Sequence, residues 1–538
     1  MKFMINAAVS ALFWSGPVAG AQAHHQHAME KLGAVSFPTS CSPAVQPQFD
    51  TAVALMHSFQ FGRAIDGFNA VLKSDPTCAI ADWGIALSAW SNPFAGFKFP
   101  AQLAQGWEAV RKARLTGART ARERAYIDAV AKLYEPGPEV QPAQRLIAYE
   151  KAMERVSVRF PRDVEATIFY ALALAASADP EDKSYAKQRR AGALLKPLFA
   201  RFPDHPGLAH YIIHAYDEPA LAAQAEQAAR RYGAIAPSTP HALHMPSHTF
   251  TRVGDWQASI DTNKASAAAA MRAGQPADVL HASDYMIYAY LQTGQDEKAR
   301  EIVQRSAGIF QTFNPANATG AAPASAAYYA NAAIPARYIL ERHAWGEAAA
   351  LPSPSSPFAN ADAITEFTRG LAATYLKDSA SARAALAALA RLKGRLAQTH
   401  DDYWAGQVHI AEREVAARLA FSEGNTETAL SGLREAARLE SATELASVTP
   451  GPLVPAHELL GDLLLETNRP AEALSEYRVS LEGNPKRFWS LTGAARAAAS
   501  SGDARAAGKY ASELLQITAN ADRPGRPERV EMQRISAK

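Results

Sequence analysis

One spacing of residues recurs along this chain of 538 residues and restricts what the chain can fold into. A small residue is followed by a bulky residue four positions later and by proline twelve positions later. The two complete copies are Ala64, Phe68 and Pro76, and Ala473, Tyr477 and Pro485. Residues four apart share one face of an α-helix, and proline cannot continue a helix. Because strand-like alternation is scarce elsewhere, the sequence predicts an all-α fold built from pairs of helices.

These copies resemble tetratricopeptide repeats, which are helix-turn-helix units of about 34 residues. The resemblance is carried by "AIDGFNAVLKSDP", "FSEGNTETALSGLREAA" and "LLGDLLLETNRPAEALSEYRVSLEGNP". Weaker copies occupy residues 193–236, 240–270, 278–308 and 488–517, so the resemblance covers about two thirds of the chain. It implies a right-handed α-solenoid of tetratricopeptide-like repeats with a concave face.

Three stretches rich in Pro, Gly and Ser interrupt the helical pattern, at residues 313–325, 351–362 and 447–455. We place a domain boundary at the second of these stretches. The sequence then predicts an N-terminal array over residues 24–350, a linker over residues 351–362 and a C-terminal array over residues 363–520. Residues 521–538 are expected to form a frayed, solvated tail.

The first 23 residues, "MKFMINAAVSALFWSGPVAGAQA", have the features of a secretory signal peptide. They contain Lys2, an apolar run too short to span a bilayer, and the small-residue ending Ala21-Gln22-Ala23. We expect cleavage near Ala23 and a periplasmic or secreted protein. No later stretch resembles a membrane span, because the other apolar runs are broken by charged residues, Gly or Pro.

The charge balance bears on the partners of the protein, and the two cysteines fit an oxidising compartment. Lys and Arg number 55 against 53 Asp and Glu, so no excess of positive charge points to nucleic acid as a partner. Cys41 and Cys78 are expected to form a disulfide in an oxidising compartment, and two free thiols are the alternative.

Histidines gather in "HPGLAHYIIHAYDEP" and "HALHMPSHTFTRVGDW". In ligand-binding tetratricopeptide proteins, positions 2, 5, 9, 12 and 13 of the repeat line the concave groove, and the register set by nearby Pro and Gly residues assigns these positions here. The residues that fall on them are His210, His214, Asp217 and Glu218; His241, His244, His248 and Arg252; and His281, Asp284 and Tyr288. We therefore expect these side chains to face a groove rather than the core, with His205 outside the groove.

The spacing of these histidines suggests a metal site. His210 and His214, like His244 and His248, are four apart and share a helix face, so these four could bind one ion. Imidazole with carboxylate suits Zn, Fe, Cu, Ni or Mn and does not distinguish among them. Asp217 or Asp284 could complete the site or orient an imidazole. The remaining groove residues are expected to bind a ligand: His241, Arg252, His281 and Tyr288.

The sequence thus predicts an exported solenoid whose groove carries a divalent transition-metal site for a small molecule or peptide. One alternative is a metal-dependent enzyme, a hydrolase or oxidoreductase, with Asp217, Glu218 or Asp284 as general base. Another is a metal-free scaffold for partner proteins. The HExxH, P-loop and GxSxG motifs are absent from the sequence.

Overall fold

A computed structural model describes residues 30–96, 98–135, 137, 140–315, 320–352 and 355–537. The predicted signal peptide and its cleavage site lie outside these residues. The described residues form the α-helices α1 to α25, so the predicted all-α fold is confirmed. None of the helices described is long and apolar enough to cross a bilayer.

The helices follow one another with short connections. The first group is α1 (Gln46–His57), α2 (Phe61–Ser74), α3 (Ala79–Trp90), α4 (Pro100–Thr116), α5 (Ala121–Ala131), α6 (Pro142–Arg159), α7 (Val164–Ala176) and α8 (Ala186–Arg201). The second is α9 (Pro206–Ala215), α10 (Glu226–Ile235), α11 (Pro240–His244), α12 (Pro246–Arg252), α13 (Trp256–Arg272), α14 (Pro276–Gln292), α15 (Asp296–Gln311) and α16 (Ala324–Leu340). The third is α17 (Ala359–Tyr375), α18 (Ser379–Gln398), α19 (Asp402–Ser422), α20 (Thr426–Ser441), α21 (Ala456–Glu466), α22 (Pro470–Gly483), α23 (Phe488–Ser500), α24 (Ala504–Ile517) and α25 (Pro527–Ser536).

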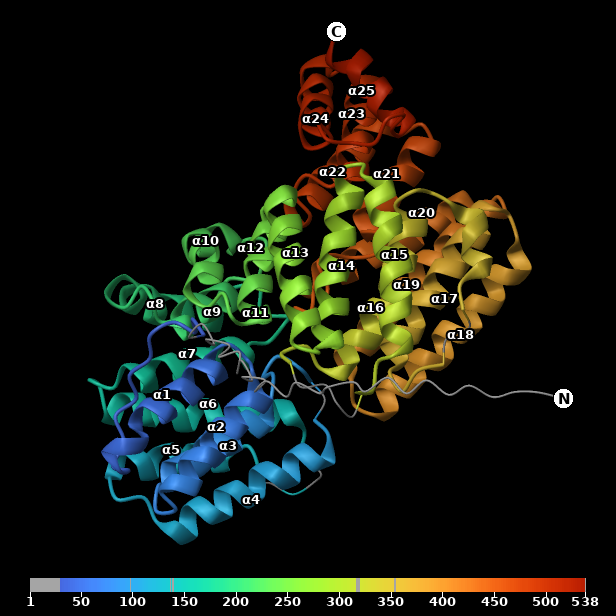
Figure 1. Ribbon diagram of the computed structural model, residues 1–538. Helices are drawn as coiled ribbons and strands as arrows, with labels where there is room; N and C mark the ends of the chain where they lie inside the picture. The colour runs from blue at the N-terminus through green and yellow to red at the C-terminus, as the bar shows by residue number, and fades with distance from the viewer. Residues whose placement is uncertain are drawn as a thin grey trace, which may run out of the picture.

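Consecutive helices pack against each other, as the repeat pattern predicts. Helices α13 to α16 lie side by side between the N-terminal helices and the C-terminal ones (Figure 1). Within the pair α21 and α22, a Cβ added at Gly461 would lie 2.8 Å from Cζ of Tyr477. Only glycine allows this approach, so the bulky position of the repeat, Tyr477, packs against a glycine on the preceding helix.

Proline and glycine set many of the helix ends. Helices α9, α11, α12 and α14 all begin with proline in the first turn, where its missing N–H costs no hydrogen bond. Gly254 ends the turn after α12 with a φ of 69°, a conformation that favours glycine. These residues are read directly from the sequence, which is why the helix boundaries there are predictable.

The buried apolar side chains form three large groups. One extends from Leu32 to Phe250, the second from Trp256 to Ile334 and the third from Leu340 to Ala507. The predicted linker ends inside α17, which begins at Ala359. The division into two arrays stays a prediction.

The described residues after 520, predicted to form a frayed, solvated tail, are mostly exposed but include a helix, α25. Helix α25 buries Met532 completely, and Arg526 forms an ion pair with Asp296 at 2.6 Å. The amide of Asp522 also donates to the carbonyl of Gly294 at 3.0 Å. The tail therefore docks on the turn between α14 and α15.

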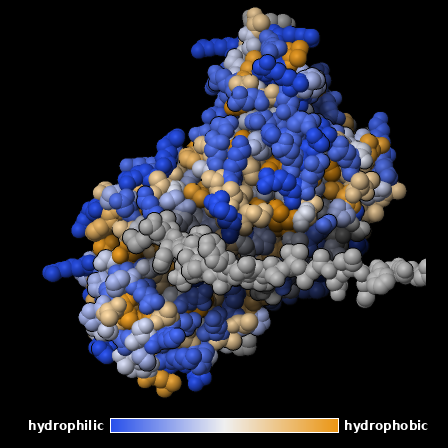
Figure 2. Space-filling model, viewed as in Figure 1, coloured by the Kyte–Doolittle hydropathy of each residue, from blue (hydrophilic) through white to orange (hydrophobic). Residues whose placement is uncertain are grey.

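Polar side chains cover most of the face over α13 to α16, with only scattered apolar patches (Figure 2).

The structure joins Cys41 to Cys78 in a disulfide that closes a loop of 37 residues. Nearby, the Ser42 amide donates to Asp75 and the Ser40 hydroxyl donates to Glu123. These contacts attach the segment before α1 to the first helices.

We expect the double variant Cys41→Ser, Cys78→Ser to lose about 2 to 4 kcal/mol of unfolding free energy, because the bond restricts the unfolded chain. Urea unfolding of the wild type with and without reductant measures the same difference. An equal midpoint for the wild type and the double variant would contradict the expectation.

Candidate metal centre

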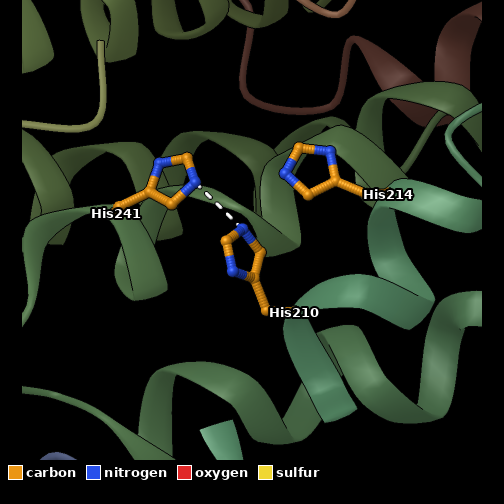
Figure 3. Close-up of side chains that lie close together, drawn as sticks. All are labelled: His210, His214 and His241. Atoms are coloured by element: carbon orange, nitrogen blue, oxygen red, sulfur yellow. Dashed lines mark hydrogen bonds between the residues drawn. The ribbon is translucent and has the colours of Figure 1, made fainter. Parts of the chain in front are cut away.

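Six histidines gather where the first helices of three successive repeats meet. His210 and His214 lie one turn apart on α9, and His241 lies on α11. One ring nitrogen from each of these three lies within 4.8 Å of the others, and we call this set the first triad. Figure 3 shows the ring of His214 facing the same space as the hydrogen-bonded rings of His210 and His241.

The second triad comprises His244, His248 and His281, from α11, α12 and α14, with ring nitrogens again within 4.8 Å of one another. The two triads are neighbours. The ring centroids of His214 and His248 are 6.2 Å apart, and those of His241 and His244 are 6.1 Å apart. Together the two triads form one histidine cluster.

Hydrogen bonds fix the orientation of three rings. Nδ1 of His210 donates to the carbonyl oxygen of His57 at 2.6 Å, because a carbonyl can only accept. Nδ1 of His244 donates to Oδ1 of Asn263 at 2.7 Å, since the Asn263 amide nitrogen donates elsewhere, to the carbonyl of Ser259.

The third anchor is a carboxylate. Nδ1 of His248 donates to Oδ2 of Asp217 at 2.8 Å. Burial alone would raise the pKa of Asp217, but His248 and Arg252 lower it below its usual value, so this carboxyl is ionised. A ring that donates through Nδ1 and is neutral carries its lone pair on Nε2. A carboxylate or amide behind a ligating histidine is the usual support of a metal ligand.

The two Nε2 atoms of His244 and His248 are 3.0 Å apart. Both rings donate through Nδ1, so in their neutral forms both lone pairs face each other across this distance. Two facing lone pairs repel unless a cation or a proton lies between them. Burial lowers the pKa of His244 well below its usual value, which opposes a proton held by His244 itself.

His214 presents a second unsatisfied group. Its side chain is 7% exposed, and neither ring nitrogen has a hydrogen-bond partner among the described residues. Its ring stacks on Phe94 with centroids 4.1 Å apart and on Phe59 at 5.6 Å. A buried polar group without a partner costs about 1 to 3 kcal/mol, and a metal ion would remove that cost.

Burial keeps five of the six histidines, all but His248, in the form that can bind a metal. It lowers the pKa of His210 and of His281 to about 3, with neighbouring histidines adding to the effect. It also lowers the pKa of His214 and His241 well below the usual value. Only the neutral imidazole is a ligand, so these residues are ready to bind near neutral pH.

The histidine cluster is buried rather than exposed in an open groove, because another part of the chain covers it. Residues 442–455, which connect α20 to α21, lie over it, and we call them the covering loop. The Tyr285 hydroxyl donates to the carbonyl of Ser447 at 3.0 Å, and Arg252 donates to that of Pro450 at 3.1 Å. The repeat register places side chains on the concave side, but only the tertiary fold shows that another part of the chain fills it.

No protein-family model matches the sequence, and no curated protein matches it significantly. A structure of the human IFIT1 dimer with m7Gppp-AAAA matches with 12% identity and a TM-score of 0.35, over 82% of this chain and 90% of that chain. The APC/C hetero-tetramer Cut9-Hcn1 matches with 12% identity and a TM-score of 0.29, over 92% and 96%. Likeness at this level assigns no activity or partner to this chain.

The structure groups the predicted metal ligands differently from the sequence. The expected single site of His210, His214, His244 and His248 is divided between the two triads, and each triad gains a residue that was assigned to ligand binding, His241 or His281. The physical reason is packing: His241 contacts His210 on α9 through Nε2 at 3.0 Å, whereas the ring of His244 lies beside that of His281 on α14, with centroids 4.5 Å apart.

The other predicted site residues lie beside the cluster or away from it. Asp217 supports His248, and Arg252 forms an ion pair with Asp217 at 3.3 Å. Asp284 is fully buried and pairs with Arg337 at 2.7 Å, which does not support its role as a general base. Tyr288 is buried next to Arg337, with its ring 5.0 Å from the guanidinium carbon.

A further buried group was not predicted. Glu165 accepts hydrogen bonds from His57 and His205, each at 2.9 Å. Although burial opposes it, the two histidines hold the pKa of Glu165 well below its usual value. The sequence feature that indicates this buried group is its charged residue, Glu165, at the start of the apolar helix "VEATIFYALALAA". His57 also supplies the carbonyl that orients His210, so this group supports the first triad from behind.

Proposed function

We propose that this protein is an exported tetratricopeptide-like solenoid that binds divalent transition-metal ions in the histidine cluster, one ion in each triad. The observation that carries the proposal is the pair of Nε2 atoms of His244 and His248, which face each other at 3.0 Å while both Nδ1 atoms donate hydrogen bonds. A metal ion that accepts both lone pairs turns this repulsion into two bonds.

The ligand type supports a transition metal over calcium or magnesium, which prefer oxygen ligands. Two nitrogen ligands bonded at about 2.1 Å in tetrahedral geometry lie about 3.4 Å apart, so the observed 3.0 Å needs only a small adjustment. The same distance separates Nε2 of His210 from Nε2 of His241. Zn, Fe, Cu, Ni and Mn all remain compatible with such ligands.

A metal-dependent enzyme is the second candidate function, and the number of ligands favours it. Each triad supplies three protein ligands, which leaves a coordination position for water or a substrate, as in catalytic zinc sites. Such a water would be the nucleophile of a hydrolase. Since Asp217 is engaged with His248 and Arg252, we assign it to orienting His248 rather than to proton transfer.

Replacing one histidine of each triad tests the proposal. We expect metal-free protein to bind two Zn²⁺ or Co²⁺ ions, and His214→Phe to weaken one of the two sites at least about 100-fold, because three ligands fall to two. His281→Phe should weaken the other site. The phenylalanine at 214 keeps a ring against Phe59 and Phe94.

His457→Ala is the matched control, since this histidine pairs with Glu476 in the C-terminal array, outside both triads. Calorimetric titration with each metal gives the number and the affinity of the sites. Equal metal affinity in the His214, His281 and His457 variants would contradict the proposal, as would a wild type that binds neither ion more tightly than about 1 mM.

A further inference from the structure

A separate cavity of about 100 Å³ lies between α16, α17, α19 and the covering loop, mostly within the predicted C-terminal array. Its size is comparable with cavities that take up a benzene-sized molecule. Trp404, Asn360 and Gln407 line it and are only half-buried, which places the cavity at the surface of the array.

Aromatic side chains form much of the lining. They are Tyr329, Phe367, Tyr403 and Trp404. The ring of Trp404 has its centroid 5.7 Å from that of Tyr329 and 5.1 Å from that of Tyr403. Aromatic faces attract cations through their electron-rich centres, and clusters of such rings bind quaternary ammonium groups.

Two carboxyl groups complete the lining. Glu440 accepts the backbone N–H of Ala456 at 3.0 Å, so the first turn of α21 satisfies it. Glu414 has no such hydrogen bond. The residue is only 3% exposed, and its Oε1 has no hydrogen-bond partner among the described residues. No described Lys or Arg pairs with it, and the described lining contains no Lys, Arg or His.

We infer that this cavity binds a small alkylammonium ion, with the aromatic rings around its alkyl groups and the Glu414 carboxylate as its counter-ion. A free anion is disfavoured because Glu414 and Glu440 both line the space. In the empty site, burial and the neighbouring Glu440 raise the pKa of Glu414 well above its usual value, so Glu414 is a neutral acid that releases its proton to water when the cation binds. The ligand supplies the cationic partner that no described Lys or Arg provides for this buried carboxyl.

Comparing the affinities for choline and for its neutral isostere, 3,3-dimethylbutan-1-ol, distinguishes the effect of charge from that of shape. We expect metal-free full-length protein to bind choline at least about tenfold more tightly than the isostere, since a desolvated cation over aromatic rings gains up to about 2 kcal/mol. Titration with n-butylammonium tests a primary amine of similar size. Because the protein is free of metal, failure here is distinct from failure of the histidine cluster to bind an ion.

Glu414→Gln should lower the affinity for choline at least about tenfold and leave that for the isostere unchanged. Glutamine has the shape of the neutral acid, so the variant should fold, and thermal unfolding checks this. Trp404→Leu should weaken choline about 2- to 30-fold. Glu427→Gln, at an exposed position on α20, is the control and should change nothing.

Three results would overturn the inference. One is equal affinity for choline and its isostere, which would make the cavity a neutral apolar site. Another is unchanged choline binding by Glu414→Gln. The third is the absence of binding by either ammonium ion below a Kd of about 1 mM.

Discussion

Replacing Arg337 with alanine should lower the free energy of unfolding by about 3 to 5 kcal/mol, the cost of leaving a buried charge unpaired. The Arg337 guanidinium is fully buried and pairs with Asp284 at 2.7 Å. It also donates to Oγ1 of Thr449 at 2.8 Å and to the carbonyl of Gly451 at 3.0 Å. The substitution therefore strands Asp284 and releases the covering loop from α16.

Arg342→Ala is the control for this experiment, because its partner Glu347 is exposed and surface ion pairs contribute about 1 kcal/mol or less. Urea unfolding of both variants measures the difference. A loss below about 1 kcal/mol in Arg337→Ala would show that the buried ion pair does not hold the covering loop in place.

Lowering the pH from 7 to 5 should destabilise the metal-free protein by several kcal/mol. Burial lowers the pKa of His210 and His281 to about 3, whereas an unfolded histidine has its usual pKa near 6.5. Below pH 6.5 the unfolded chain binds protons that the folded chain does not accept until about pH 3. The free energy of unfolding therefore decreases as the pH is lowered through this window. At pH 5 the decrease is about 2 kcal/mol for each of the two histidines.

Denaturant unfolding at pH 7 and pH 5 measures this dependence. His281→Phe should reduce the difference in unfolding free energy between pH 7 and pH 5 by about 2 kcal/mol. Nδ1 of His281 has no hydrogen-bond partner among the described residues, so its removal leaves no described partner of this atom unsatisfied. Equal stability of the metal-free wild type at both pH values would mean that the histidines accept protons in the folded state.

The helices are predictable because their signals are local. The repeat spacing predicts the pair of helices that α21 and α22 form, and the Pro and Gly residues at helix ends stand in the sequence at the boundaries that the structure shows. The pairing of His210 with His214 is predictable in the same way, because both lie on α9. Each of these features depends on residues close together in one helix or one turn.

The composition of each triad and its burial are not local. His241 lies on α11 and contacts His210 on α9, and the direction of its ring follows from how these helices pack. The covering loop lies about 200 residues from Arg252, which it contacts through Pro450. The docked tail depends in the same way on the distant ion pair of Arg526 with Asp296. Repeat register carries no information on such contacts.

The metal content of the protein tests the central claim most directly. Elemental analysis of mature protein purified without an affinity tag should find one transition-metal ion for each triad, hence about two per chain, and about one in His214→Phe. A wild-type protein that copurifies with no transition metal, and takes up none after dialysis against Zn²⁺, would contradict the account.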